Sequence, residues 1–237
     1  MNRGWRSPGG DGVRTASWMR LAVLMLLPAM GCRTKAVAEL PVDAAPAAQS
    51  EWEKRDSWQR PAEVMDALGV RPGSAVADVG AGDGYFSFHL ASRVGAKGKV
   101  YAEDIAGWQL EKIRERARKE GLSQIETILG AEDDPKLPPG TLDAILTVLT
   151  YHEMQNYDAM LTAMIRALKP GGILAVIDDE AEPDRTRSSS APEHKIAKKL
   201  VREDAARHNI HFVREEKGFE ANPNSHLFFL IFEKSKR

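Results

Sequence analysis

The chain has 237 residues, 43% of them hydrophobic, which suffices for one domain with a sizeable core. Its 33 basic and 34 acidic side chains give a formal net charge of −1, so the composition carries no electrostatic footprint for nucleic acid. The single cysteine excludes an intramolecular disulfide and a cysteine-based zinc site, and no metal site is predicted.

Residues 1–32 have the pattern of an export signal. Two arginines precede an apolar run at 21–30 that is too short to span a bilayer. Cys32 follows the tripeptide AMG, which resembles the lipobox of bacterial lipoproteins. The resemblance implies lipidation at Cys32 and a lipid-anchored protein at the cell envelope, on an unspecified side of the membrane. An ordinary thiol is the alternative. Residues 1–18 are long and glycine-rich for the charged head of a signal, so Met19 is an alternative start. A cytoplasmic protein is expected if the start site is misassigned.

A flexible tether at 33–50, rich in Ala and Pro, separates this segment from a single expected domain at 51–237. Trp52 and Trp58 are predicted to pack an N-terminal arm onto the domain, with a direct role in ligand binding as the alternative. A helix is expected at 61–68, because it begins with proline and carries apolar residues on one face.

A strand, a glycine loop and a helix follow one another at 75–94. The apolar run at 75–79 predicts a buried strand, and Gly80, Gly82 and Gly84 come directly after it. From Tyr85 the apolar residues take helical spacing. Glycines allow a ligand to approach the backbone, and the first N–H groups of a helix are free to bind an anionic group. The junction is therefore a candidate cradle for a small molecule.

The spacing of the glycines bears on the choice of ligand. The dinucleotide-binding fingerprint is G-x-G-x-x-G, whereas Gly80 to Gly84 reads G-x-G-x-G. Asp78 stands near the end of the buried strand, where an unpaired carboxylate is costly. A cationic ligand or loop N–H groups would partner it, whereas a dinucleotide pyrophosphate is itself negative.

The segment VADVGAGDGYFS resembles the first motif of class I S-adenosylmethionine-dependent methyltransferases, and further matches run from Pro61 to the C-terminus. The resemblance implies S-adenosylmethionine as cofactor, with its methionine portion held by Asp78, Gly80, Ala81, Gly82 and Gly84. Alternating strands and helices predict an α/β, Rossmann-like fold: a seven-stranded, mostly parallel sheet with helices on both faces and a C-terminal antiparallel hairpin.

Glu103 and Asp104 end a predicted strand that begins at residue 99. An acid at this position accepts the ribose hydroxyls in nucleotide-binding folds. The resemblance assigns that role to Asp104 and makes Glu103 a bystander. The alternative is that an acid of this pair caps the helix that starts near Gly107.

A third strand is expected at 125–129, after a solvated helix at 110–119. The loop that follows contains an acid that accepts the adenine amino group in the resembled family. Glu132 and Asp133 both qualify, and the sequence leaves the choice between them open.

The fourth strand, at 142–149, leads into the segment TYHEM at the expected crevice of the sheet. His152 can accept a proton near neutral pH, and Tyr151 can stack or donate a hydrogen bond. A structural imidazole is an equally supported alternative for His152. Asp178 follows a fifth strand at 173–177 and is the acid there best placed to orient a substrate, with simple solvation as the alternative.

The remaining segments complete the expected fold. The LKPGG turn is the third family match, and His194 has no role that the sequence assigns. The predicted segments are a helix at 156–168, a mobile loop at 182–190, a helix at 193–207 and closing strands at 210–213 and 227–232.

These features predict a methyltransferase that acts on a small-molecule acceptor. Five-position cytosine methylation needs a cysteine nucleophile, and Cys32 lies outside the domain. The Asn/Asp-Pro-Pro-aromatic motif of amino-group DNA methyltransferases is also absent at 147–152. One alternative is a non-catalytic S-adenosylmethionine- or nucleotide-binding protein at the membrane, because export would remove the domain from the cytoplasm, where the donor is made. The other is a nicotinamide-dependent oxidoreductase. The sequence reveals neither the acceptor, the methylated atom nor the oligomeric state.

Overall fold

The fold was analysed in a computed structural model, which describes residues 51–219 and 226–236. The predicted signal, the tether and Cys32 lie outside these residues. Within them, no helix combines the length and apolar character needed to cross a membrane.

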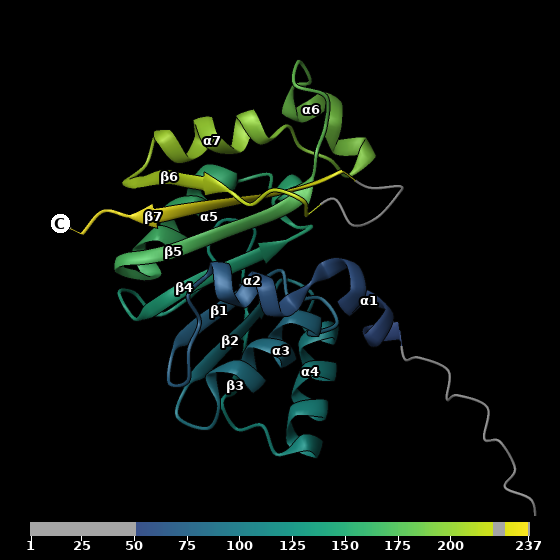
Figure 1. Cartoon of the computed structure of the whole chain (residues 1–237), viewed down its shortest axis with the longest axis vertical. Coiled ribbons are helices and arrows are strands. Elements are labelled where there is room, and N and C mark those ends of the chain that lie inside the picture. The colour runs from purple at the N-terminus through teal and green to yellow at the C-terminus, as the bar shows by residue number, and fades with distance from the viewer. Residues whose placement is uncertain (1–50, 220–225, 237) are drawn as a thin grey trace, which may run out of the picture. The chain divides into compact units, whose positions relative to one another are not determined.

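The described residues form one mixed sheet with helices around it (Figure 1). The helices are α1 (Glu51–Gln59), α2 (Pro61–Ala67), α3 (Tyr85–Val94), α4 (Gly107–Glu120), α5 (Tyr157–Ala167), α6 (Arg187–Ser190) and α7 (Lys198–Ala206), with 3-10 turns η1 (Tyr151–Glu153) and η2 (Ala191–Glu193). The strands are β1 (Ala75–Val79), β2 (Lys99–Asp104), β3 (Ile125–Leu129), β4 (Leu142–Val148), β5 (Leu168–Asp179), β6 (Ile210–Glu215) and β7 (Leu227–Lys234).

The strand order confirms the predicted architecture. The seven strands run β3-β2-β1-β4-β5-β7-β6, and β7 is antiparallel to both of its neighbours while the other pairs are parallel. The carboxyl ends of β1, β2, β4 and β5 therefore meet at one edge of the sheet, where ligands bind in folds of this kind.

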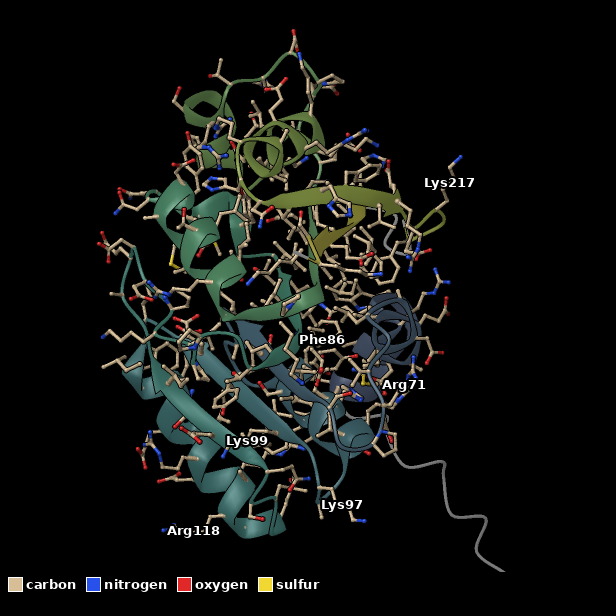
Figure 2. The ribbon with its side chains drawn as sticks, turned by 90° about the vertical axis from the view of Figure 1, so that its left-hand side faces the viewer. Arg71, Phe86, Lys97, Lys99, Arg118 and Lys217 are labelled. Atoms are coloured by element: carbon tan, nitrogen blue, oxygen red, sulfur yellow. The ribbon has the colours of Figure 1, made fainter. Side chains whose placement is uncertain are left out.

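Successive side chains of the central strands enter two apolar clusters, one on each face of the sheet. In β1, Val76 packs with residues of α2 and α3, whereas Ala77 packs with residues of α5 and α7. Figure 2 shows Phe86, from α3, within the body of the domain, whereas Lys97 and Arg118 lie at its periphery. Burial on both faces explains why the strands read as continuous apolar runs in the sequence.

Strand β5 begins earlier than predicted. The sequence favoured a turn at 168–172, but Leu168 already pairs with Leu142, and the register shifts before Ala144. Gly172 allows this close pairing, because a side chain there would lie 3.1 Å from the carbonyl oxygen of Leu142. The family's LKPGG segment is thus the kinked start of a strand.

Helix α7 begins later than predicted, and the loop before it contains α6. The backbone N–H of Ile196 donates to the carbonyl of Asp179 at 2.9 Å, and Ala181 N–H donates to the carbonyl of Ile196 at 3.1 Å. These bonds hold the segment before α7 extended beside the end of β5, so the helix starts only at Lys198. They also bring His194 close to the sheet edge.

Candidate active site

A pocket of about 450 Å³ lies where the carboxyl ends of β1, β2 and β4 meet. Its wall includes the glycine loop after β1, both acids at the end of β2, and the turn after β4. This volume falls within the range of small-molecule sites. The sequence-predicted cradle is therefore a real concavity at the expected edge of the sheet.

The three glycines of the loop have different roles. A side chain at Gly80 would lie 2.3 Å from Thr150, and one at Gly84 would lie 2.8 Å from Ile113, so packing requires glycine at both positions. Gly82 has φ +54°, and a Cβ there would meet nothing within 4 Å. Gly82 thus presents open backbone to the pocket, as a closely approaching ligand requires. This geometry fits the donor implied by the resemblance.

Asp78 lines the pocket at its inner end and is 3% exposed. Its Oδ2 accepts a hydrogen bond from Ser87 Oγ at 2.6 Å, which provides the partner that a buried carboxylate needs. Burial raises the pKa of Asp78 to about 6, and the bond from Ser87 opposes this rise. A cation in the pocket would stabilise the ionised carboxylate.

The two acids at the end of β2 have different surroundings. Asp104 accepts N–H bonds from Gly82 and Ala106, each at 2.8 Å, and so fastens the glycine loop to the start of α4. Glu103 is 2% exposed, lies against Gly130, and has an Oε1 with no hydrogen-bond partner among the described residues. Burial raises the pKa of Glu103 to about 8. Both acids line the pocket, so Glu103, the predicted bystander, also borders the space for the ligand.

The loop after β3 contributes only one of its two candidate acids to the pocket. Glu132 lines the wall, whereas Asp133 does not. Ile105 also lines the pocket and is 61% exposed, so its apolar surface is available to a flat ring. The sequence did not single out Ile105, although an apolar residue directly after Asp104 was a usable signal.

Helix α1 supplies two pocket residues that the sequence did not predict. Arg55 and Gln59 both line the wall. Arg55 lies 2.8 Å from the carboxylate of Asp83 and stacks 4.0 Å above the ring of Tyr85. Trp52 packs against the same tyrosine with ring centroids 5.4 Å apart, which confirms the predicted packing of the arm. The sequence could not single out Arg55, because it stands in a stretch of mixed charge that is typical of an exposed surface.

The structure joins His152 to Asp178. His152 Nδ1 lies 2.7 Å from Asp178 Oδ1, and the backbone N–H of His152 donates to Asp178 Oδ2 at 3.0 Å. Burial alone would lower the pKa of His152, but the hydrogen bond to Asp178 and its charge raise it above the ordinary value. The next residue, Glu153, lines the pocket. His152 and Asp178 themselves stand behind Glu153 and do not line the pocket, and Nε2 of His152 is buried without a hydrogen-bond partner among the described residues.

Tyr151 does not reach the pocket. It is 1% exposed, and its hydroxyl donates to Asp204 Oδ2 at 3.0 Å. Successive residues of the turn η1 point their side chains in different directions. The local sequence pattern could not reveal the hydrogen-bond partner of Tyr151, because that partner lies 53 residues away. The placement favours a structural role for Tyr151 over the predicted role in acceptor binding.

The strand order and the glycine cradle define the architecture of the S-adenosylmethionine-dependent methyltransferases. The chain superposes with a TM-score of 0.66 and 28% identity on the crystal structure of a SAM dependent methyltransferase from Aquifex aeolicus, covering 76% of this chain and 93% of that one. A model of the ubiE/COQ5 methyltransferase family matches residues 51–191. The chain belongs to this family, and S-adenosylmethionine is the cofactor of its class.

Two curated relatives carry more specific names. The chain is 37% identical over 115 residues to the ubiquinone/menaquinone biosynthesis C-methyltransferase UbiE of Chromobacterium violaceum, covering 48% of this chain and 47% of that protein. It is 31% identical over 121 residues to the demethylmenaquinone methyltransferase of Listeria welshimeri, covering 51% and 50%. The chain thus spans about half the length of the curated relatives it matches. These matches favour neither the oxidoreductase nor the non-catalytic alternative.

Fold alone does not determine the reaction. The [4+2]-cyclase SpnF superposes with a TM-score of 0.66 at 16% identity, covering 79% of this chain and 84% of that one. Such a likeness shows the fold only. The acceptor must therefore be argued from the side chains of the site.

Proposed function

We propose that the protein transfers a methyl group from S-adenosylmethionine to a ring carbon of a hydroxylated, quinone-type acceptor. The family match carries the proposal, because the two curated relatives are named as methyltransferases of ubiquinone or menaquinone biosynthesis. The pocket supports it with apolar side chains beside the turn after β4, which suit a flat ring: Phe86, Val148, Leu149, Met154 and Met160.

Each part of the donor has a matching group in the pocket. S-adenosylmethionine supplies the methyl group on an electrophilic sulfonium. Asp78 would face the cationic methionine portion, and Arg55 stands where it can pair with a carboxylate. Asp104 would accept the ribose hydroxyls, and Glu132 would accept the adenine amino group. Holding donor and acceptor in line is the largest contribution expected from the protein, because the leaving thioether needs no proton.

His152 is the proposed proton acceptor. Asp178 holds a proton on Nδ1, which leaves the lone pair of Nε2 to receive the proton of the acceptor hydroxyl. The resulting ring oxygen donates electron density to the ring carbon that attacks the methyl group. The bond from sulfur to the methyl group breaks as the new carbon–carbon bond forms, and S-adenosylhomocysteine leaves. The hydrogen on that carbon is then lost to water as a proton, which restores the aromatic ring, and His152 returns its own proton to the ring oxygen.

The test is calorimetry followed by turnover with the full chain. We expect saturable binding of S-adenosylmethionine and, with a reduced quinone lacking one ring methyl group, formation of the methylated product. His152→Gln should lower kcat while leaving donor affinity unchanged, and the exposed His211→Gln serves as its control. Donor binding without transfer to any hydroxylated ring would overturn the acceptor assignment, and absence of donor binding would overturn the whole proposal.

A further inference from the structure

Three potential metal ligands lie together: His152, Glu153 and His194. Of these, Glu153 lines the pocket. Glu153 Oε1 lies 3.6 Å from His152 Nε2 and 3.5 Å from His194 Nδ1. All three ligand atoms fall within 4.8 Å of one another. The sequence predicted no metal site, because His194 stands 41 residues from Glu153 and no short motif joins them.

The spacing suits a transition-metal ion. Bonds of about 2.0 Å in a tetrahedral zinc site place neighbouring ligand atoms roughly 3.3 Å apart. Both separations from Glu153 are within a few tenths of an ångström of that value, so small side-chain rotations would close the site. Two histidines and one carboxylate leave a coordination position open, as in catalytic zinc sites.

Independent evidence comes from the imidazole of His152. Its side chain is 4% exposed, and its buried Nε2 has no hydrogen-bond partner among the described residues. The other nitrogen, Nδ1, lies 2.7 Å from the fully buried carboxylate of Asp178. A carboxylate behind a histidine fixes the ring and aims its free nitrogen, which is the usual support of a metal-ligating histidine. An unpartnered buried nitrogen is otherwise costly.

Main-chain hydrogen bonds hold the three ligands of the cluster close together. Ile196 pairs with the end of β5 through its N–H and its carbonyl, so the chain at His194 is carried along the same sheet edge as Asp178. His152 and His194 pack edge to face with ring centroids 5.5 Å apart. The two imidazoles are therefore neighbours because of main-chain pairing.

We propose that His152, Glu153 and His194 bind a divalent transition-metal ion, with Zn²⁺ as its representative, at the acceptor end of the pocket. Metal binding does not depend on the methyl transfer, but the role of the metal rests on the proposed function. Glu153 lines the pocket, so the open coordination position would face the acceptor. A bound oxygen of the acceptor would lose its proton to water more readily, and His152 would then act as a ligand in place of a proton acceptor.

The test is zinc titration of tag-free, chelator-treated full chain by calorimetry, in a Cys32→Ser background that removes the competing thiol. We expect one Zn²⁺ per chain. His194→Asn keeps a residue that tolerates the left-handed backbone at φ 55°, and Glu153→Gln preserves shape at an exposed position. Each should weaken zinc binding at least about tenfold. The control His211→Asn should leave it unchanged.

The outcomes separate the two parts of the inference. Absence of zinc binding, or equal affinity in all three variants, overturns the metal site. Zinc binding that depends on His194 and Glu153 supports it. Methyl transfer that is lost on chelation and restored by Zn²⁺ supports the catalytic role, whereas transfer at the same rate without metal overturns that role. Donor binding, measured separately, reports on the proposed function itself.

Discussion

The side chain of Thr150 fills the space that a Cβ at Gly80 would occupy, with Cγ2 only 2.3 Å from that position. The loop after β1 and the turn after β4 are therefore interlocked. Both residues line the pocket, so this contact joins the proposed donor side of the site to the proposed acceptor side.

Gly80→Ala should therefore disrupt the site. The methyl group collides with Thr150, and φ +74° is unfavourable for alanine, so we expect the free energy of unfolding to fall by about 2 kcal/mol or more. Gly82→Ala is the matched comparison, because its Cβ meets nothing. It should cost about 1 kcal/mol from backbone strain and mainly weaken donor binding. Urea unfolding and calorimetry measure the two effects, and equal stability losses would contradict the interlock.

Donor affinity should fall as the pH drops through about 6, the pKa to which burial raises Asp78. Only the ionised carboxylate attracts a cation, so affinity should approach a loss of about tenfold per pH unit below that value. Protonation of Asp78 does not unfold the protein, because a raised pKa makes its contribution to stability greatest at low pH. Calorimetry between pH 5 and pH 8 measures the effect. Asp78→Asn should bind weakly at every pH, and an unchanged profile in that variant would refute the assignment.

Glu103 should make the donor-free protein less stable at alkaline pH. Its pKa rises from 4.5 to about 8 on folding, so its stabilising contribution is complete below about 4.5 and is lost as the pH rises through 8. Glu103→Gln should abolish this decline and raise the unfolding free energy at pH 9 by on the order of a few kcal/mol. Urea unfolding at pH 5 and pH 9 tests it, with the exposed Glu115→Gln as control. A parallel decline in wild type and Glu103→Gln would contradict the claim.

Asp104→Ala should weaken donor affinity by about tenfold or more, because it removes the proposed ribose partner and the anchor of Gly82. Asp104→Asn retains one side-chain oxygen that can accept the hydrogen bond from Gly82, so it should lose less donor affinity than Asp104→Ala. Calorimetry with both variants separates the two contributions. Unchanged affinity in Asp104→Ala would transfer the ribose role to Glu103.

Lipidation at Cys32 stays a prediction from the sequence. We propose that it holds the protein at a membrane, where lipid-dissolved quinones reside. Cys32→Ser should move the protein from the membrane fraction to the soluble fraction of its host and abolish incorporation of labelled fatty acid. If the wild-type protein stays in the soluble fraction and incorporates no labelled fatty acid, the predicted lipid anchor is wrong.

Local signals explain what the sequence predicted well. The strand at 75–79, the glycine loop and the helix from Tyr85 are contiguous, so composition and spacing alone locate a small-molecule cradle, and the family resemblance names its ligand. The seven-stranded sheet follows from alternating apolar runs and from family resemblance. These features are set by residues that lie close together in the sequence, so a local pattern is enough to predict them.

Long-range pairing explains what the sequence could not predict. His152 and Asp178 were each candidates, but their double contact across 26 residues is visible only in the fold. Tyr151 looked equally suitable, yet Asp204 holds it in the core. His194 reaches the site because of strand-like pairing at Ile196, where the pattern had predicted a helix.

The most direct test of the central claim is the position of the transferred methyl group. The full chain is incubated with S-adenosylmethionine carrying a ¹³C-labelled methyl group and with a reduced quinone that lacks one ring methyl group, and the product is examined by carbon NMR. We expect a labelled methyl group bonded to a ring carbon, formed in step with S-adenosylhomocysteine. A labelled methyl on oxygen, or bound donor with no labelled product, would contradict it.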